Sequence, residues 1–293
     1  MTSAAAPSPE TLVTRFAPSP SGLLHLGHAH AALFAERAAR DAGGRFLLRI
    51  EDIDLGRCRP DFEAAIADDL AWLGLDWERP VLRQSERFPV YRAALDKLRD
   101  RGLLYPCFCT RKEIRQEIAS AGQAPHGPDG PLYPGTCRGL DAEERRARIA
   151  DGRAYALRLD MAAAVAAAGQ IAWTEYGRGL DGAAIPAEPE IHGDVVLARK
   201  DVPTSYHLAV TLDDAEQGVT LVTRGEDLAP ATHVHRLLQV LLDLPVPAWH
   251  HHSLIADPAG RRLAKRDDAQ SIRGLRDQGL TPADVCAQAG FPD

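Results

Sequence analysis

Two histidines that flank a glycine stand where the sequence changes from a strand pattern to a helix pattern. Residues Leu12 to Phe16 form a short apolar run, prolines and Gly22 interrupt it, and an alanine-rich segment with helical periodicity begins at Gly27. A strand-to-helix turn presents free backbone N–H groups and the positive end of the helix dipole, and both favour phosphate binding. His25, Gly27 and His28 are therefore candidate ligands of a polyphosphate, and an exposed polar helix start is the alternative for this motif alone.

A carboxylate follows the next apolar run. Residues Arg45 to Ile50 form this run after a double glycine, and Glu51 comes directly after it. Ligands of open α/β sheets bind at the carboxyl ends of the strands. Glu51 therefore stands where a functional carboxylate is expected, and an acidic loop that caps the following helix is the alternative.

Three of the five cysteines bracket a segment that is dense in glycine and proline. Cys107, Cys109 and Cys137 supply three thiols, whereas a closed structural zinc site needs four ligands. His126 and Tyr133 are the candidates for the fourth ligand, and imidazole is the commoner choice on chemistry alone. Three buried thiols without a metal are the alternative. An odd number of cysteines in a chain without an export signal argues against a disulfide framework.

Alternating strands and helices are expected to position these residues. The sequence predicts helices at 27–43, 61–73, 87–100, from Thr110 onward, at 141–151 and at 230–242, and strands at 12–16, 45–50, 155–159, 171–176, 195–198, 206–212 and 219–223. This order favours an α/β fold with a Rossmann-like nucleotide-binding domain. We expect a flexible tail at 1–10, the two halves of that domain at 11–106 and 183–255, an inserted α+β zinc-containing subdomain at 107–182, and a loop with a short helical C-terminal segment at 256–293.

Composition limits the possible classes of protein. The chain has 293 residues, of which 45% are hydrophobic and 26% are charged, so it can build one large or two modest cores. No apolar run is long enough to cross a bilayer and the first ten residues lack the features of a signal peptide, so a cytoplasmic protein without membrane contact is expected. The net charge of −7 argues against a general nucleic-acid binder, and any RNA contact must use a local basic patch.

The motifs together resemble those of the class I aminoacyl-tRNA synthetases in their glutamate-specific form. The run from Arg15 to His28 resembles the HIGH region of that family with its proline-rich approach. Further matches follow in the family's order: 49–54 with Arg57, 68–77, 205–209 with Asp213 and Asp214, 221–227, and 262–266. Five matches in the right order are hard to reach by chance.

The resemblance implies how ATP is used. Class I activation joins a carboxylate to the α-phosphate of ATP and expels pyrophosphate, with Mg²⁺ accompanying the nucleotide. His25 and His28 would hold the phosphates, and Lys265 matches the second lysine of the KMSKS motif, which would neutralise charge on the departing pyrophosphate. Without the HIGH-like stretch, the basic run around Lys265 would be read as a solvated surface loop.

The resemblance also implies a glutamate pocket. Glutamate has two carboxylates and an ammonium group, so a selective pocket needs two guanidinium forks and one acid. Arg15, Arg224 and Glu51 supply this set, although the sequence does not assign either arginine to a particular carboxylate. An ordinary strand-end ion pair for Arg224 and a core aromatic for Tyr206 are the alternatives. The family's glutamate-binding residues map onto Arg15, Ala17, Ser19, Glu51, Tyr206 and Arg224.

Details favour a short, tRNA-modifying branch of the glutamate family. That branch uses a tyrosine four residues before the last cysteine as a zinc ligand, which selects Tyr133, and Val210 replaces an asparagine of the full synthetases. Only 28 residues follow Lys265, which leaves no room for the helical domains that grip the anticodon arm.

We therefore expect a monomer that binds one structural Zn²⁺, activates L-glutamate with ATP and transfers it to the queuosine base in the anticodon stem-loop of aspartate tRNA. The alternatives are a trimmed glutamyl-tRNA synthetase that charges the tRNA 3′ end and a non-catalytic, synthetase-like RNA-binding module. A simple adenylyltransferase is more distant.

Overall fold

A parallel sheet forms the N-terminal part of the molecule. The computed structural model describes residues 11–120, 126–128, 130–255 and 271–292. Strands β1 (Val13–Phe16), β2 (Arg45–Ile50) and β3 (Glu78–Arg83) lie in the order β1-β2-β3 and are parallel. Helices α1 (Leu26–Asp41) and α2 (Pro60–Trp72) connect them, so the predicted β-α-β unit is confirmed.

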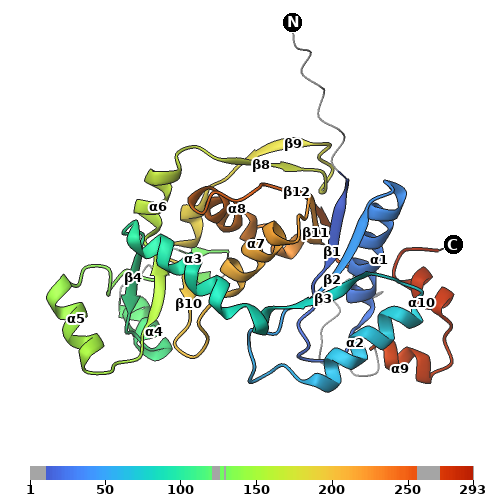
Figure 1. Cartoon of the computed structure of the whole chain (residues 1–293), viewed down its shortest axis with the longest axis horizontal. Helices are drawn as coiled ribbons and strands as arrows, with labels where there is room; N and C mark the ends of the chain where they lie inside the picture. Colours follow the sequence, from blue (N-terminus) through green and yellow to red (C-terminus); the bar gives the residue numbers. More distant parts are fainter. Residues whose placement is uncertain (1–10, 121–125, 129, 256–270, 293) are drawn as a thin grey trace, which may run out of the picture.

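A second sheet continues this arrangement. Its strands β11 (Leu221–Gly225), β12 (Ala248–His252), β8 (Ala172–Glu175) and β9 (Ala183–Pro186) lie in that order, and β11, β12 and β8 are parallel. Helix α8 (Ala231–Leu241) connects β11 to β12. Strand β1 lies beside β11, where the Thr220 amide donates to the Val13 carbonyl at 3.0 Å (Figure 1). The α/β class is confirmed. From β1 the chain continues to β2 on one side, and from β11 it continues to β12 on the other side. Open α/β sheets bind ligands at such a reversal of strand order.

The other end of the molecule is built from an antiparallel sheet and helices (Figure 1). Strands β10 (Val196–Ala198), β7 (Ala156–Leu159) and β4 (Leu104–Cys107) form this sheet in that order. The surrounding elements are α3 (Phe88–Asp100), α4 (Arg111–Ser120), α5 (Ala142–Ala150), α6 (Met161–Ala168) and the short pair β5 (His126–Gly127) and β6 (Gly130–Pro131). Strand β8 of segment 107–182 joins the sheet of β11 and β12, whereas β10, outside that segment, pairs with β7.

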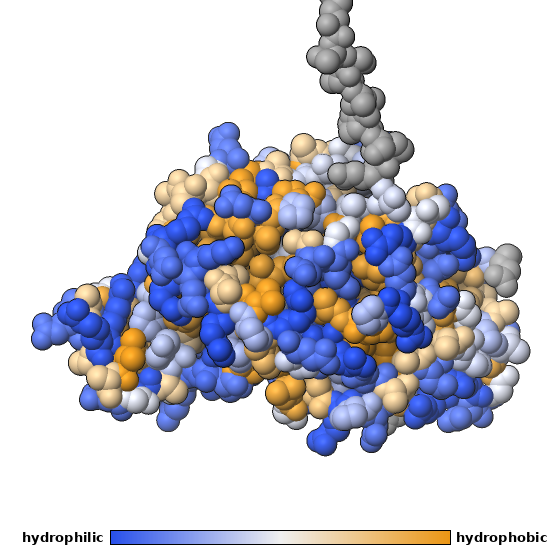
Figure 2. All heavy atoms as spheres, viewed as in Figure 1, coloured by the Kyte–Doolittle hydropathy of each residue, from blue (hydrophilic) through white to orange (hydrophobic). Residues whose placement is uncertain are grey.

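Short helices complete the described chain. They are η1 (Gln84–Arg87), η2 (Pro189–His192), η3 (Glu226–Leu228), α7 (Tyr206–Glu216), α9 (Ile272–Asp277) and α10 (Pro282–Gln288). Ile272 and Val285 bring α9 and α10 into the apolar cluster that covers β1 and β2, as expected for a short helical C-terminal piece. Hydrophilic residues dominate the projecting end around α5 (Figure 2). Among the described helices, none combines the length and the apolar character that crossing a membrane requires.

The strand predicted at 206–212 is wrong, because this segment begins helix α7. The Ser205 hydroxyl accepts a hydrogen bond from the Leu208 amide and caps the helix. Leu208 and Leu212 are four residues apart, which is a helical spacing that a short apolar run conceals. The correction matters for function, since a helix puts Tyr206 on the same side as Asp213 and Asp214, seven and eight residues later.

Candidate active site

The two predicted histidines meet at the start of α1. His25 is the N-cap residue, and its Nδ1 accepts a hydrogen bond from the Gly27 amide at 3.1 Å. The His25 amide donates to His28 Nδ1 at 3.2 Å, and the ring centroids are 3.9 Å apart. A Cβ on residue 27 would lie 3.1 Å from the His25 ring, so glycine permits this close arrangement. The helix start thus presents two imidazoles at the positive end of the helix dipole, a position that favours phosphate binding.

The chain returns to this helix start near its C-terminus. Ser271 forms an isolated antiparallel bridge with His25, and the Ile272 amide donates to the Leu24 carbonyl at 2.8 Å. Lys265 lies outside the described residues. It stands six residues before Ser271 in the sequence, and its role near the phosphates stays a prediction.

The loop after β1 is fixed to the end of β2. The Glu51 amide donates to the Pro18 carbonyl at 3.0 Å, and the Ser21 amide donates to the Ser19 carbonyl at 2.8 Å. Ala17 is half-buried and Ser19 is exposed. These contacts bring Ala17 and Ser19, which the resemblance assigned to the glutamate pocket, next to the strand end that carries Glu51.

A buried ion network joins Arg15, Arg49, Glu51 and Asp214. Arg15 Nε and Nη2 donate to the Asp214 carboxylate at 2.9 and 3.3 Å, and Arg15 Nη1 donates to the Thr223 carbonyl at 3.0 Å. Arg49 donates to Asp214 at 2.7 Å and to Glu51 at 3.1 Å. Asp214 is therefore shared between Arg15 and Arg49, and Glu51 supplies the second negative charge of the network.

The pKa shifts of the two acids differ for physical reasons. Burial would raise the pKa of Asp214, but the Arg15 and Arg49 guanidiniums outweigh it and hold this pKa below its usual range. Burial also raises the pKa of Glu51, and here the charges of Arg49 and Arg15 offset the effect only in part. The negative charge of Glu51 is thus less fully balanced by nearby cations than that of Asp214. A cation placed beside Glu51 would stabilise its charged form.

Arg224 has a different environment, because its guanidinium donates to histidine rings and hydroxyl groups. It donates to His251 Nε2 at 3.2 Å, to the Tyr206 hydroxyl at 3.3 Å and to the Thr232 hydroxyl at 2.6 Å. Its Nη1 also lies 3.2 Å from His235 Nδ1. Among the described residues, no carboxylate forms an ion pair with Arg224. Burial, strengthened by the nearby charge of Arg15, lowers the pKa of this guanidinium, so an incoming anion would stabilise it.

The predicted pocket residues converge at the carboxyl ends of β1, β2 and β11. Tyr206, at the start of α7, is half-buried. Burial raises its pKa, while the charges of Arg224 and Arg15 lower it and that of Glu51 raises it. These mutual effects require the four side chains to be close neighbours. Two guanidiniums, one carboxylate and one phenol match the groups of an amino acid with an acidic side chain.

Sequence reasoning missed the residues that surround the two arginines. Arg49 and Asp214 stand within matched motifs, and a helical reading of α7 would have placed Asp214 near Tyr206. Thr232, His235 and His251 carry no local signal in the sequence.

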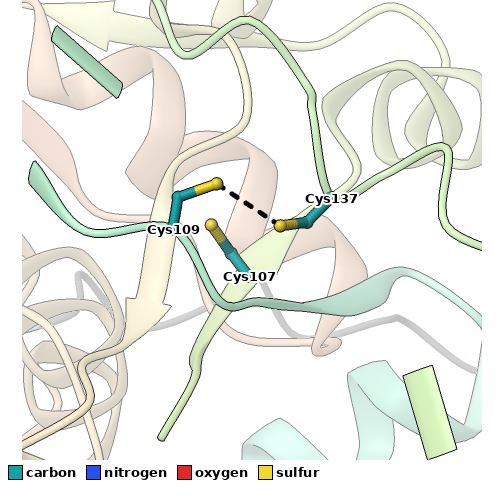
Figure 3. A group of neighbouring side chains, drawn as sticks. All are labelled: Cys107, Cys109 and Cys137. Carbon is teal, nitrogen blue, oxygen red and sulfur yellow. Dashed lines mark hydrogen bonds between the residues drawn. The ribbon is translucent and has the colours of Figure 1, made fainter. Parts of the chain in front are cut away.

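The three predicted cysteines form a cluster beneath β4. The Sγ atoms of Cys107, Cys109 and Cys137 lie within 4.8 Å of one another, and Figure 3 shows them pointing toward a common centre. The Tyr133 hydroxyl lies 3.4 Å from Cys107 Sγ and 3.6 Å from Cys109 Sγ, and it accepts a hydrogen bond from the Cys137 amide at 2.9 Å. His126 is exposed in β5 and does not belong to this cluster.

The donor set of this cluster fits a zinc ion. A tetrahedral zinc with Zn–S bonds of about 2.3 Å places its sulfur ligands about 3.8 Å apart. Cys109 Sγ and Cys137 Sγ are 3.4 Å apart, and the contacts of Tyr133 are of similar length. Burial raises the pKa of Cys109 to about 11, so a cation is what would make this thiol a thiolate ligand. The arrangement therefore supports Tyr133 rather than His126 as the fourth ligand.

Comparisons with known proteins agree with this geometry. Residues 11–288 match the family model of the catalytic domain of class I tRNA synthetases (E and Q). A glutamyl-Q tRNA(Asp) synthetase of Rhodobacter capsulatus is 54% identical over 94% of this chain and 98% of its own length, and one of Symbiobacterium thermophilum is 47% identical over 96% and 86%. A crystal structure of glutamate-tRNA synthetase from Elizabethkingia anophelis superposes with a TM-score of 0.78 at 29% identity. The superposition covers 94% of this chain and 60% of that one.

Proposed function

The chain belongs to the glutamate- and glutamine-specific class I tRNA synthetases, and we propose that it activates L-glutamate with ATP and transfers it to the queuosine base of aspartate tRNA. The observation that carries this proposal is the 54% identity to a glutamyl-Q tRNA(Asp) synthetase over 98% of that protein's length. The described pocket supplies the chemistry that such an enzyme needs.

Glutamate selection rests on the unequal environments of the two pocket arginines. Arg15 is already paired with Asp214, whereas Arg224 keeps its charge for a ligand. We therefore assign one substrate carboxylate to Arg224, with the Tyr206 hydroxyl beside it. The substrate ammonium group would balance the remaining negative charge of Glu51. Without a ligand, burial raises the pKa of this carboxyl. A charge-assisted contact of this kind contributes about 1.5–3 kcal/mol to binding.

Activation requires little more than positioning and charge stabilisation. A glutamate carboxylate oxygen attacks the α-phosphorus of ATP, a P–O bond forms, and the bond to pyrophosphate breaks. His25 and His28, at the positive end of the α1 dipole, would hold the phosphates, and Lys265 would stabilise charge on the leaving group. Mg²⁺ would supply further neutralisation of the phosphates.

We assign one structural zinc ion to Cys107, Cys109, Tyr133 and Cys137. The ion would connect the end of β4 with the chain around Cys137, and no step of the reaction passes through it. The cluster lies against Phe108 and Tyr155 and forms with them a small core beside the antiparallel sheet of β4 and β7. Its expected role is therefore to stabilise this part of the fold.

The acceptor follows from the relatives rather than from the pocket. A hydroxyl of the modified base would attack the glutamyl adenylate, form an ester and release AMP. Because the chain carries a net charge of −7, the anticodon stem-loop would have to bind to a local basic surface. An ordinary glutamyl-tRNA synthetase would use the same activation chemistry, so the acceptor is what distinguishes the two functions.

The activation step can be tested without tRNA. Glutamate-dependent exchange of labelled pyrophosphate into ATP is expected. Exchange with glutamine or aspartate is expected to be at least about a hundredfold weaker, because a site whose buried polar groups are left unpaired by an analogue rejects it by up to about 10⁴–10⁵-fold. Exchange that does not depend on glutamate would contradict the proposed substrate.

A further inference from the structure

Two histidines hold the Arg224 guanidinium, and one of them is oriented by a buried carboxylate. His251 Nδ1 lies 2.6 Å from Glu175 Oε2, while His251 Nε2 accepts the hydrogen bond from Arg224 Nε at 3.2 Å. A neutral imidazole has one donor and one acceptor nitrogen, so Nδ1 carries the proton and Nε2 presents its lone pair to Arg224. Glu175 thereby fixes the tautomer of His251 that Arg224 requires.

Glu175 is itself held in place. Its Oε1 accepts from the amides of Gly177 at 2.9 Å and His251 at 3.0 Å, and its Oε2 accepts from Trp173 Nε1 at 3.2 Å. A Cβ on residue 177 would lie 2.3 Å from the His251 carbonyl, so only glycine allows β8 to end this close to β12. Burial would raise the pKa of Glu175, but the hydrogen bonds from His251 outweigh it and hold this pKa at about 2.

The second histidine is oriented in a similar way. His235 Nδ1 lies 3.2 Å from Arg224 Nη1 and must accept, because a guanidinium has only donors. His235 Nε2 then carries the proton and donates to His207 Nδ1, 3.2 Å away. Burial, strengthened by the Arg224 charge, lowers the pKa of His235 well below its usual value. This ring is therefore a neutral acceptor.

The two arginines of the pocket thus have different partners. Arg15 forms a direct ion pair with the Asp214 carboxylate. Among the described residues, no carboxylate bonds to Arg224 directly, and that of Glu175 is separated from it by the imidazole of His251. An imidazole spacer fixes the direction of the guanidinium without neutralising its charge, which leaves the charge to attract a substrate carboxylate.

We propose that the pairs Glu175–His251 and His207–His235 are positioning residues that hold Arg224 on neutral acceptors. Arg224 then binds the side-chain carboxylate of the substrate, and its fixed orientation sets the preference for glutamate over glutamine. This inference rests on the proposed function. A purely structural role for these residues would affect stability and leave substrate preference unchanged.

The test compares variants in glutamate-dependent pyrophosphate exchange. Glu175→Gln is nearly isosteric, and its amide oxygen would remain at the Oε1 position to accept the two backbone amides. Its NH₂ group would then face His251 Nδ1, so His251 would carry its proton on Nε2, against the Arg224 N–H. We expect the KM for glutamate to rise about tenfold or more, the scale of one lost charge-assisted hydrogen bond, with kcat changed less than about threefold.

A second pair of variants keeps the test independent of folding defects. His235→Asn retains an acceptor near the position of Nδ1 and should keep the KM within about threefold of the wild type, whereas His235→Leu removes the acceptor and should raise the KM about tenfold. His233→Leu is the matched control, because His233 lies on the same helix and accepts from the Glu188 amide instead of contacting Arg224. Its KM should equal that of the wild type.

Glutamate binding measured by calorimetry distinguishes a failure of the positioning role from a failure of the proposed function. Wild-type binding together with unchanged KM values and an unchanged glutamate-to-glutamine ratio in Glu175→Gln and His235→Leu would overturn the positioning role and leave the proposed function standing. A wild type that neither binds nor exchanges glutamate would overturn both. Weaker glutamate binding in these two variants, with normal binding in His233→Leu, is the result we expect.

Discussion

Replacing Asp214 by asparagine should destabilise the protein strongly and in a pH-dependent way. Asp214 is buried and accepts hydrogen bonds from Arg15 at 2.9 and 3.3 Å and from Arg49 at 2.7 Å. Asparagine keeps the shape and removes the negative charge. Arg15 would then lose its carboxylate partner, and the buried Arg49 would keep Glu51 as an ion-pair partner and Gln217 as a neutral acceptor.

The magnitude follows from this burial. Removing one partner of a buried ion pair costs about 3–5 kcal/mol, because the remaining charge is left uncompensated. That is a large part of the roughly 5–15 kcal/mol that stabilises a typical domain. At about 2–4 °C per kcal/mol for large single chains, the melting temperature should fall by roughly 6–20 °C.

Urea unfolding at several pH values is the appropriate assay. The folded-state pKa of Asp214 lies below its usual value, so its contribution is fully present above the unfolded-state pKa of about 3.9 and is lost as the pH falls through the folded-state pKa. The stability difference between wild type and Asp214→Asn should therefore be full at pH 7 and narrow below about pH 4.

A surface aspartate supplies the control for this experiment. Asp68 pairs with Arg276 at the exposed surface, so Asp68→Asn should change the stability by less than about 1 kcal/mol. A loss below about 1 kcal/mol for Asp214→Asn at pH 7, or a difference that stays constant down to pH 3, would refute the reasoning.

Three further changes test the assigned sites. Arg224→Lys keeps a positive charge but loses the planar fork, so the KM for glutamate should rise about 10- to 100-fold in pyrophosphate exchange, and an unchanged KM would remove Arg224 from the pocket. One zinc ion per chain should be lost from Cys109→Ser and retained in His126→Ala, as measured by metal analysis; loss from His126→Ala with retention in Tyr133→Phe would reverse the choice of fourth ligand. Lys265→Ala should slow exchange at least about a hundredfold, and wild-type exchange would exclude Lys265 from the mechanism.

Sequence patterns predicted those parts of the site that are formed by residues close together in the chain. The turn from β1 into α1 places His25 and His28 together because cap geometry depends on neighbouring residues. The cysteine spacing likewise predicted a cluster, which the structure brings together. In segment 206–212, by contrast, the apolar residues suggested a strand, and the cap at Ser205 was the overlooked evidence for a helix.

Contacts between distant segments could not be read from the sequence. Glu175 and His251 meet because β8 and β12 are parallel neighbours, and the side chain of Arg224 extends from β11 to His235 on α8. Arg49 and Asp214 are 165 residues apart and meet only after the two sheets are joined. Such pairs depend on the tertiary arrangement, which no periodicity within one element specifies.

The site of glutamate attachment tests the central claim most directly. Isolated anticodon stem-loops of aspartate tRNA, one carrying queuosine and one carrying guanosine at the same position, would be incubated with the protein, ATP and labelled glutamate, beside full-length glutamate tRNA. We predict that label appears on the queuosine stem-loop and on neither of the other two RNAs. Label on the 3′-terminal adenosine of glutamate tRNA, with an unlabelled queuosine stem-loop, would contradict the account.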